Sequence, residues 1–556
     1  MTQLVFVPLG GVGEIGMNLA LYGYGPEDDR TWIMVDCGVT FPGPDLPGVD
    51  LVLPDIRWLK AQRERLAAIV ITHAHEDHYG ALLSLYPELS PKQDIPLYMT
   101  PFGAGMLDSK AKGEPGAQKI AITEFNAGDR FEIGPFEIEA VAVTHSIPEP
   151  VSLAIRSPLG TILHTGDWKN DTDPSLGPLI NKNRFQELGE EGVLALICDS
   201  TNAMRDGVSP SEVEVAEGLR KVIEAAQGRV AVTTFSSNVG RIKSIALAAE
   251  RAGRQTLLLG RSMRRVVDVA TELGYMEGVP AFLSEEEYGY IPRDKVVIIL
   301  TGSQGESRAA LGKLSRDEMR DVALTAGDTV VYSSRDIPGN EKPILDTKNR
   351  LIDMGINIVV DSDALVHVSG HPRRNELRDM YAWTKPQIGI PVHGEAAHLT
   401  AHAALMRENG IKDVMDVRNG DLVRLAPGHP TIVADVPHGQ IYKDGRMLGD
   451  ADEVGVTDRR RLSFAGHVCM SIIMNKQHEI AADPQLSAIG IPAETASGDD
   501  MEDLLYDAAI DAIESMPRGR RKDLDAIENA ASRAIRAVAR NEWGKKPIVT
   551  VFVDRI

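Results

Sequence analysis

Residues 66–78 read LAAIVITHAHEDH, a short apolar run followed at once by a cluster of metal-binding side chains. The run is rich in β-branched residues, so it predicts a buried strand that places the cluster in a loop at its carboxyl end. From an extended backbone, His73 and His75 can reach one metal ion, whereas Asp77 and His78 lie past the bend and can face a second. Imidazole and carboxylate ligands without cysteine favour zinc or manganese in a catalytic site over a closed structural site. The alternative, a polar turn with surface histidines, is a poor account of four such residues within six positions.

Two further candidate ligands also follow predicted strands. The run 136–143 predicts a strand that ends just before His145, and the run 161–164 predicts one that ends just before Asp167. Each residue alone is typical of a turn. Together they predict the third histidine of one metal site and a carboxylate that can bridge two metals.

The segment Gly11–Gly16 matches the GxGxxG pattern of dinucleotide-binding folds, and Asp36 lies where a ribose-binding acid is expected. Such a fold needs a helix directly after the glycines. The runs 17–23 and 31–36 instead predict two strands around a turn that contains Gly25. The pattern therefore favours a tight strand connection over a dinucleotide site.

The order HxHxDH, a later single histidine and then Gly-Asp at a strand end resembles the nuclease-bearing branch of the metallo-β-lactamase fold. The resemblance implies an α/β fold, an αββα sandwich with two metals at one edge. It also implies two ligand sets that share one carboxylate: the first is His73, His75, His145 and Asp167, and the second begins with Asp77, His78 and Asp167.

Strands and helices alternate over about 205–365, which predicts a second, parallel sheet covered by helices. The predicted strands end in serine, asparagine, glycine and arginine, side chains that suit anion binding by hydroxyls and backbone amides. Ser236, Ser237 and Asn238 form one such end and open a helix. The alternative is that these residues only cap helices.

Two histidine motifs follow, HVSGH at His367–His371 and PVHGE around His393. A catalytic core, an inserted α/β domain and two such motifs resemble the β-CASP nucleases, and DSTN, SSN, TGSQGE, HVSGH and PVHGE together resemble the ribonuclease J family. Asp199, His371 and His393 fall at three β-CASP motifs. Histidine in place of valine at the last motif is the form associated with RNA processing.

This resemblance implies a 5′-to-3′ exoribonuclease that prefers 5′-monophosphorylated RNA and also cuts internally, in mRNA decay and rRNA maturation. It implies two zinc ions, or manganese, with His393 completing the second ligand set. Asp77 would orient the attacking hydroxide, and His371 paired with Asp199 would be the general acid; the alternative for His371 is a metal-ligand or phosphate-contact role. The expected pocket for the 5′ phosphate consists of Ser236, Ser237, Asn238, His367, Val368, Ser369, Gly370 and His371.

Family members can also hold a calcium ion with acids near the positions of Asp50 and Asp444. Asp450 competes with Asp444 for this alignment. A calcium site is therefore an additional expectation from the resemblance.

The expected domains are a metallo-β-lactamase core in two parts, an inserted β-CASP domain, a linker and a small C-terminal α/β domain. Their predicted bounds are 1–204 and 366–440 for the core, 205–365 for the insertion, 441–465 for the linker and 466–556 for the last domain. The last domain has two strands and two amphipathic helices without a catalytic cluster. By resemblance it supports a homodimer or homotetramer, and RNA-decay proteins are expected partners.

The amino-acid composition limits the possible substrates and the possible cellular compartment. A net charge of −21 argues against a polyanionic substrate without excluding one, since two divalent metals make the site itself electropositive. The three cysteines are far apart and mostly in apolar runs, so we expect reduced thiols in a cytoplasmic protein. No apolar run is long enough to cross a membrane, and no signal peptide is expected. The remaining alternatives are a hydrolase of small esters, a DNA-directed β-CASP nuclease and an inactive scaffold.

Overall fold

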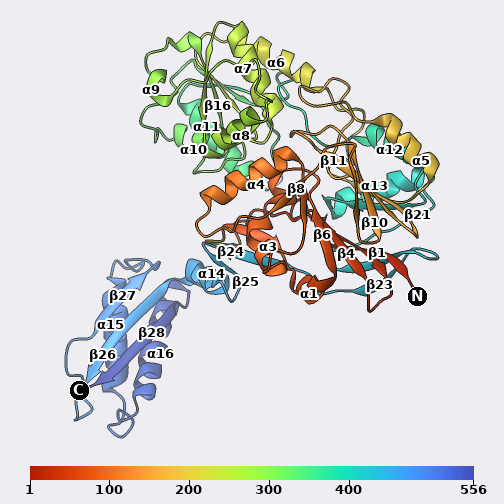
Figure 1. The fold of residues 1–556 in the computed structure, drawn as a ribbon. Helices are drawn as coiled ribbons and strands as arrows, with labels where there is room; N and C mark the ends of the chain where they lie inside the picture. The colour runs from red at the N-terminus through yellow and green to blue at the C-terminus, as the bar shows by residue number, and fades with distance from the viewer. Residues whose placement is uncertain (338) are drawn as a thin grey trace. The chain divides into compact units, whose positions relative to one another are not determined.

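A computed structural model describes residues 1–337 and 339–556 of the chain (Figure 1). It divides into two compact units, residues 1–40 with 52–440 and residues 41–51 with 441–556. Within the described residues no helix combines the length and the apolar character that a membrane crossing requires. All three cysteines are free thiols, as predicted, and Cys37 and Cys198 are buried while Cys469 is half-buried.

Two sheets face each other in the first unit. The eight-stranded sheet has the order β23-β22-β1-β3-β4-β6-β7-β8, and the seven-stranded sheet has the order β21-β19-β13-β12-β11-β10-β9. The strands of the first sheet are β1 (Gln3–Gly10), β3 (Leu19–Gly25), β4 (Thr31–Val35), β6 (Leu66–Val70), β7 (Leu97–Met99), β8 (Ile122–Glu124), β22 (Asp421–Ala426) and β23 (Thr431–Asp435). Those of the second are β9 (Arg130–Ile133), β10 (Phe136–Ala142), β11 (Val151–Ser157), β12 (Gly160–His164), β13 (Val193–Asp199), β19 (Ile388–Val392) and β21 (Asp413–Val414).

One apolar core lies between these sheets. It contains inward-facing residues of both, among them Phe6 and Val70 from the first sheet and Leu153 and Ile390 from the second. A second core, with Phe185 among its residues, packs helices against the outer face of the second sheet. These helices are α5 (Lys182–Glu191), α12 (Arg374–Thr384) and α13 (Ala396–Glu408). Helices α1 (Arg57–Ala61), α3 (Leu82–Leu89) and α4 (Pro101–Gly113) lie beside the first sheet in Figure 1. The predicted αββα sandwich is confirmed.

The strand predicted before the histidine cluster is confirmed as β6, which pairs in parallel with β4 and β7. The prediction of a loop holds for His73 and His75 but is wrong for Asp77 and His78. These two lie in the short helix α2 (Glu76–Tyr79), which begins after His75. Acidic side chains in its first turn favour a helix there because they interact with the positive end of the helix dipole.

The glycine-rich segment is followed by β3 and β4 without an intervening helix, as predicted. The two short strands β2 (Val12–Gly13) and β20 (Gly394–Glu395) pair beside it, and β5 (Leu51–Pro54) follows β4. The geometry therefore agrees with a tight strand connection, and the dinucleotide interpretation is excluded.

The inserted α/β region forms a five-stranded sheet in the order β15-β16-β14-β17-β18, and every pair in it is parallel. Its strands are β14 (Val230–Thr233), β15 (Gln255–Leu259), β16 (Val296–Leu300), β17 (Thr329–Tyr332) and β18 (Asn357–Val359). Its helices are α6 (Glu212–Ala225), α7 (Val239–Arg251), α8 (Arg261–Glu272), α9 (Glu285–Tyr288), α10 (Ala310–Leu314) and α11 (Glu341–Asp353), and it also contains the 3₁₀ helix η2 (Arg293–Lys295). The other 3₁₀ helix in the described residues, η1 (Arg63–Arg65), belongs to the sandwich. The predicted parallel sheet with covering helices is confirmed.

The second unit contains a three-stranded sheet in the order β27-β26-β28, whose apolar residues pack against two helices. These elements are β26 (His467–Met474), β27 (Gln485–Ile489), β28 (Ile548–Arg555), α15 (Met501–Glu514) and α16 (Leu524–Trp543). The expected linker contains β25 (Met447–Gly449) and α14 (Val456–Ala465), and β24 (Gln440–Asp444) begins just before it. Strand β27 was not expected. The predicted domain bounds stay a prediction.

Four buried charges tie the sandwich to the inserted region. Glu212 accepts hydrogen bonds of 2.8 to 3.0 Å from Arg241, and Lys169 lies 2.7 Å from Asp171 and 3.8 Å from Glu212. Their side chains are at most 6% exposed. Because Lys169 comes two residues after the candidate ligand Asp167, this network fixes the segment that carries that ligand.

We expect Glu212→Ala to lower the free energy of unfolding by about 3–5 kcal/mol, because it leaves a buried guanidinium without its partner. Urea unfolding followed by circular dichroism measures this loss. The matched control is Glu217→Ala in the same helix, where an exposed ion pair with Arg220 is removed and little change is expected. Equal losses in the two variants would contradict the structural role of the buried network.

Candidate metal centre

The site forms where the parallel strands of both sheets end. Asp36 follows β4, His73 follows β6, and Asp167 follows β12, while Asp199 ends β13 and His393 follows β19. Within each sheet these strands are parallel neighbours. The carboxyl ends of parallel neighbours meet at one edge, and stacking the two sheets brings these edges together. Residues separated by more than 300 positions therefore share one site.

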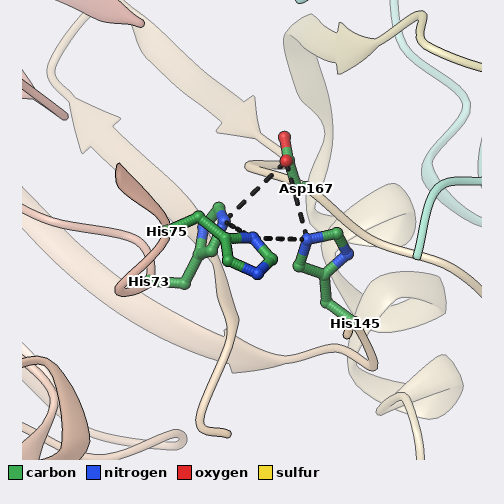
Figure 2. A group of neighbouring side chains, drawn as sticks. All are labelled: His73, His75, His145 and Asp167. Carbon is green, nitrogen blue, oxygen red and sulfur yellow. Dashed lines mark hydrogen bonds and ion pairs between the residues drawn. The ribbon is translucent and has the colours of Figure 1, made fainter. Parts of the chain in front are cut away.

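His73, His75, His145 and Asp167 point toward a common centre (Figure 2). His75 Nδ1 lies 3.1 Å from His73 Nε2 and 3.0 Å from His145 Nε2. Asp167 Oδ2 lies 3.8 Å from His73 Nε2 and 3.6 Å from His145 Nε2. Ligands about 2.0–2.2 Å from a tetrahedral zinc ion are about 3.3 Å apart. The spacing therefore fits a metal with these four ligands.

The other nitrogen of each of these imidazoles faces a supporting group. His73 Nδ1 lies 3.0 Å from Thr72 Oγ1, and His145 Nδ1 lies 2.7 Å from the carbonyl oxygen of Gly370. His75 Nε2 lies 3.1 Å from Ser237 Oγ. Such partners orient a histidine and leave its second nitrogen for a metal.

A second group consists of Asp77, His78, His393 and again Asp167. His78 Nε2 lies 3.2 Å from Asp167 Oδ2 and 3.6 Å from Asp77 Oδ2. His393 Nε2 lies 3.7 Å from Asp77 Oδ2, and His393 Nδ1 lies 3.4 Å from Asp167 Oδ1. Asp167 Oδ1 is buried without a hydrogen-bonding partner among the described residues. The Asp167 carboxylate belongs to both ligand groups, and one of its two buried oxygens has no hydrogen-bonding partner in the described structure, which fits a carboxylate that bridges two cations.

The charges in the first ligand group also suit metal binding. Burial lowers the pKa of His73 and His145 well below the usual histidine value and that of His75 to about 4, so these imidazoles are neutral. Burial opposes the charge of Asp167, but His393, His78 and His371 outweigh it and hold the pKa of Asp167 well below its usual value. Neutral imidazoles and ionised carboxylates are the forms that ligate metals.

Asp36 and Asn18 support the second group, and sequence reasoning missed both roles. Asp36 Oδ2 lies 2.7 Å from His78 Nδ1, and its Oδ1 accepts a hydrogen bond of 2.8 Å from the Thr72 backbone amide. The Asn18 side chain lies 3.0 Å from His78 Nε2 and 3.1 Å from His393 Nδ1. The available signal was an acid directly after a predicted strand, and its position after the glycine motif indicated only a ribose ligand.

We expect Asp36→Asn to weaken metal binding by about 10- to 100-fold, because a neutral amide orients the His78 imidazole less firmly and makes it a weaker ligand. Competition with a chelator, followed by metal analysis of the desalted protein, measures the change. Asp45→Asn is the control, since that carboxylate is exposed and belongs to the second unit. Unchanged chelator competition in Asp36→Asn would contradict the supporting role.

His371 and Asp199 form a pair at the edge of the cluster. His371 Nδ1 lies 2.7 Å from Asp199 Oδ2 and 3.8 Å from Asp167 Oδ2. Asp199 Oδ1 accepts hydrogen bonds of 2.8 and 2.7 Å from the amide and hydroxyl of Thr201. Burial lowers the pKa of His371, but Asp199 and Asp167 outweigh it and raise this pKa to about 9. The pair can therefore hold a proton next to the two ligand groups.

The residues predicted for the phosphate pocket differ in their surroundings. Ser237 touches His75, as described above, and Ser236 is half-buried. The Asn238 side chain accepts a hydrogen bond of 2.9 Å from the Arg241 amide, so it caps helix α7. The side of the predicted pocket that contains Ser236 and Ser237 therefore reaches the first ligand group.

The HVSGH segment forms a second wall. Ser369 Oγ accepts a hydrogen bond of 3.0 Å from the Asn202 side chain. A Cβ at Gly370 would come within 2.5 Å of His145 Nδ1, so the close approach to this histidine requires glycine. Val368 is buried, and His367 Nδ1 is buried without a hydrogen-bonding partner in the described part of the chain.

The acids expected to bind calcium already have partners. Asp50 Oδ2 accepts a hydrogen bond of 2.8 Å from the Gly445 amide, and Asp444 is paired with the Arg459 guanidinium. Asp450 Oδ1 accepts hydrogen bonds of 3.0 Å from two backbone amides of its own loop. Every group of three or more candidate ligands found in the described residues contains Asp167. The calcium site stays a prediction.

Family models match four segments of the chain. Residues 31–182 match the beta-lactamase superfamily domain, and residues 227–351 match the ribonuclease J beta-CASP domain. Residues 355–415 match the Zn-dependent metallo-hydrolase RNA specificity domain, and residues 454–556 match the ribonuclease J C-terminal domain. These matches favour RNA over the ester and DNA substrates that were alternatives.

Curated relatives match along the whole chain. Ribonuclease J of Sinorhizobium meliloti is 62% identical over 100% of this chain and 98% of its own. Ribonuclease J of Thermus thermophilus is 35% identical over 98% of this chain and 94% of its own. A crystal structure of a protein of unknown function from Enterococcus faecalis shares the fold, with a TM-score of 0.52, 17% identity, and coverage of 76% of this chain and 100% of that one. The chain belongs to the ribonuclease J family, metal-dependent hydrolases of the metallo-β-lactamase fold that cleave RNA.

Proposed function

We propose that this ribonuclease degrades RNA from the 5′ end, prefers a 5′ monophosphate and also cuts internally, and that it acts in mRNA decay and rRNA maturation. One observation carries the proposal. Ser237, at the start of helix α7 in the inserted region, lies 3.1 Å from His75 in the first ligand group. A terminal phosphate held by this wall lies close to the bond that is cut, which explains release of nucleotides from that end.

Two zinc ions, or manganese ions, fit the donors described above. His73, His75, His145 and Asp167 would hold the first, and Asp77, His78, Asp167 and His393 would hold the second. Two bound divalent metals supply a hydroxide near neutral pH and neutralise the charge on the phosphate oxygens. Asp167 belongs to both sets, so its carboxylate would be shared by the two metals.

The proton transfers of the reaction are carried out by two side chains of the protein, Asp77 and His371. The side chain of Asp77 is 31% exposed, so one of its oxygens can orient the attacking water and accept its proton. His371 donates a proton from Nε2 to the departing ribose oxygen, while Asp199 holds Nδ1 and stabilises the charged imidazole. The same pairing keeps the imidazole plane constant as the proton leaves.

The end pocket distinguishes a 5′ monophosphate from other ends. Its donors are hydroxyls and amides of Ser236, Ser237, Asn238, His367, Val368, Ser369, Gly370 and His371. Neutral donors of this kind enclose a compact dianion. A triphosphate is bulkier and more highly charged than the dianion that such donors enclose, and a 5′ hydroxyl leaves these donors without a partner.

We also propose an oligomeric state, protein partners and a cellular compartment. The C-terminal α/β domain supports a homodimer or homotetramer. The ribonuclease has RNA-decay proteins as partners and acts in the cytoplasm. Asp50 and Asp444 contribute to a calcium site if the pairing of Asp444 with Arg459 opens.

The test uses one RNA with a 5′ monophosphate, triphosphate or hydroxyl. We expect wild-type protein to release nucleotides fastest from the monophosphate, and Ser237→Ala to reduce this preference by about 5- to 10-fold, the effect of one hydrogen bond of about 1–1.5 kcal/mol. Ser262→Ala in helix α8 is the matched control because that serine is exposed. A 5′-hydroxyl RNA degraded by wild-type protein as fast as the monophosphate would overturn the end pocket.

A further inference from the structure

Arg205, Arg335 and Arg373 gather beside the catalytic histidine from three separate segments. Arg205 lies in the loop after β13, Arg335 lies in the loop after β17, and Arg373 directly precedes helix α12. The carbonyl oxygen of Arg205 accepts a hydrogen bond of 2.9 Å from the amide of Arg374, the residue after Arg373. Burial and then the neighbouring guanidiniums lower the pKa of Arg335 and of Arg205. The fold therefore concentrates positive charge here in a chain of net charge −21.

In the described part of the chain, no carboxylate oxygen that forms an ion pair lies within 4.0 Å of a nitrogen of these three guanidiniums. Asp361 and Asp336 are the acids whose charges reach Arg335, and Asp336 lies 3.7 Å from Lys348. The adjacent Arg374 differs, since it pairs with two acids at 3.3 and 3.4 Å. Like charges that are held together without a direct ion pair favour the binding of an anion.

The cluster is joined to the active site by Asn202. Arg335 donates a hydrogen bond of 3.2 Å to Asn202 Oδ1. The Asn202 amide in turn donates to Ser369 Oγ at 3.0 Å and to the carbonyl oxygen of His371 at 3.1 Å. One asparagine therefore sets the position of an arginine relative to the histidine that faces the departing oxygen.

We infer that Arg205, Arg335 and Arg373 form a binding site for internucleotide phosphates of the substrate RNA, distinct from the pocket for its 5′ end. The inference rests on the proposed function, because it takes RNA held at its 5′ end as the substrate. Guanidinium groups bind phosphate oxygens through paired hydrogen bonds. Ser237 contacts the metal ligand His75 on one wall of the end pocket, whereas Asn202 links Arg335 to the other wall at Ser369 and His371, so the arginines lie beside the pocket and not among its donors.

This site also accounts for RNA binding by an acidic protein. Each phosphate contact releases counterions, so binding through it weakens as salt is added, with a slope of about −0.7 in log affinity per contact for single strands. Removing an arginine that contacts a phosphate therefore has a specific signature. It makes the salt dependence shallower and leaves the cleavage step unchanged.

The experiment measures kcat and kcat/KM of the full chain on 5′-monophosphorylated single-stranded RNA at about 50 to 200 mM KCl. We expect Arg335→Gln and Arg373→Gln each to make the slope of log kcat/KM against log salt shallower by about 0.7, with kcat retained. Arg335→Lys keeps the charge and most of the slope. Arg374→Gln is the matched control, because it removes the same charge from a neighbouring, ion-paired arginine.

Thermal unfolding of each variant tests the fold separately. Because the arginines repel one another, Arg373→Gln is expected to unfold at the wild-type temperature or above it, whereas Arg335→Gln also loses the hydrogen bond to Asn202. Wild-type salt slopes in both variants, or the same change in Arg374→Gln, would overturn the inference. A lower unfolding temperature of Arg373→Gln would also count against it, since it would mean that Arg373 has a structural partner.

A second RNA with a 5′ hydroxyl separates this inference from the proposed end preference. Shallower slopes on both RNAs support contact with internucleotide phosphates, whereas a change confined to the monophosphate places the arginines at the terminal phosphate and overturns the assignment. If wild-type protein cleaves both RNAs at equal rates and the variants still show shallower salt slopes, the end pocket would be overturned and the arginine site would be supported.

Discussion

Asp167→Asn is expected to reduce RNA cleavage by more than about 100-fold, beyond the loss expected for a residue that only supports a ligand. Asp167 belongs to both ligand groups, lies 3.2 Å from His78 and 3.6 Å from His145, and has a buried oxygen without a hydrogen-bonding partner in the described structure. Asparagine keeps the shape of the side chain but removes its charge. Both metal sites therefore weaken together.

Metal analysis of the purified variant, beside single-turnover cleavage, measures both losses. Asp173→Asn is the control, because it makes the same change at an exposed position of the same segment. Thermal unfolding of the metal-free proteins shows whether the variant folds. A variant that binds full metal and cleaves RNA at the wild-type rate would refute the shared-ligand assignment.

His371→Ala is expected to slow cleavage of ordinary RNA by about 10²- to 10⁴-fold, the usual contribution of a positioned general acid. His371 lies outside the two four-residue groups of metal ligands and is held by Asp199 at 2.7 Å. Its raised pKa, about 9, means that the imidazole holds a proton at neutral pH. Loss of this proton donor leaves the departing oxygen with its full negative charge.

A substrate with sulfur in place of the departing ribose oxygen distinguishes proton donation from phosphate contact. Sulfur leaves without a proton, so His371→Ala should cleave this RNA nearly as fast as wild-type protein does. His429→Ala is the control, since the side chain of that histidine is 74% exposed and pairs with Asp413, which lies beside the first residue of β19 and not beside its carboxyl end. A variant that is equally slow on both substrates would assign His371 to phosphate contact, the alternative role.

The sequence by itself determined the elements and the candidate ligands. Local patterns were enough for this, because a β-branched run is a strand wherever it is buried, and a histidine or aspartate directly after such a run lies at a strand end. The strand β6, the parallel inserted sheet and the strand pair after the glycines were predicted in this way. Resemblance to a nuclease family then grouped His145, Asp167 and His393 with the first cluster.

Local patterns failed where helix and strand signals were weak. Asp77 and His78 lie in a single helical turn that is too short to show a periodic pattern. The strand β27 has only five residues and is held by its pairing with β26. In both cases neighbouring structure, rather than propensity, decides the conformation.

Only the tertiary structure decided which polar residues support the ligands. Asp36 supports His78, Asn202 joins Arg335 to His371, and each pair brings together residues from different elements. Nothing in the sequence around Asp36 distinguishes a ribose ligand from a partner of a histidine. The difference arises when two sheets stack and their strand ends meet, because contacts over such separations depend on packing that no local pattern contains.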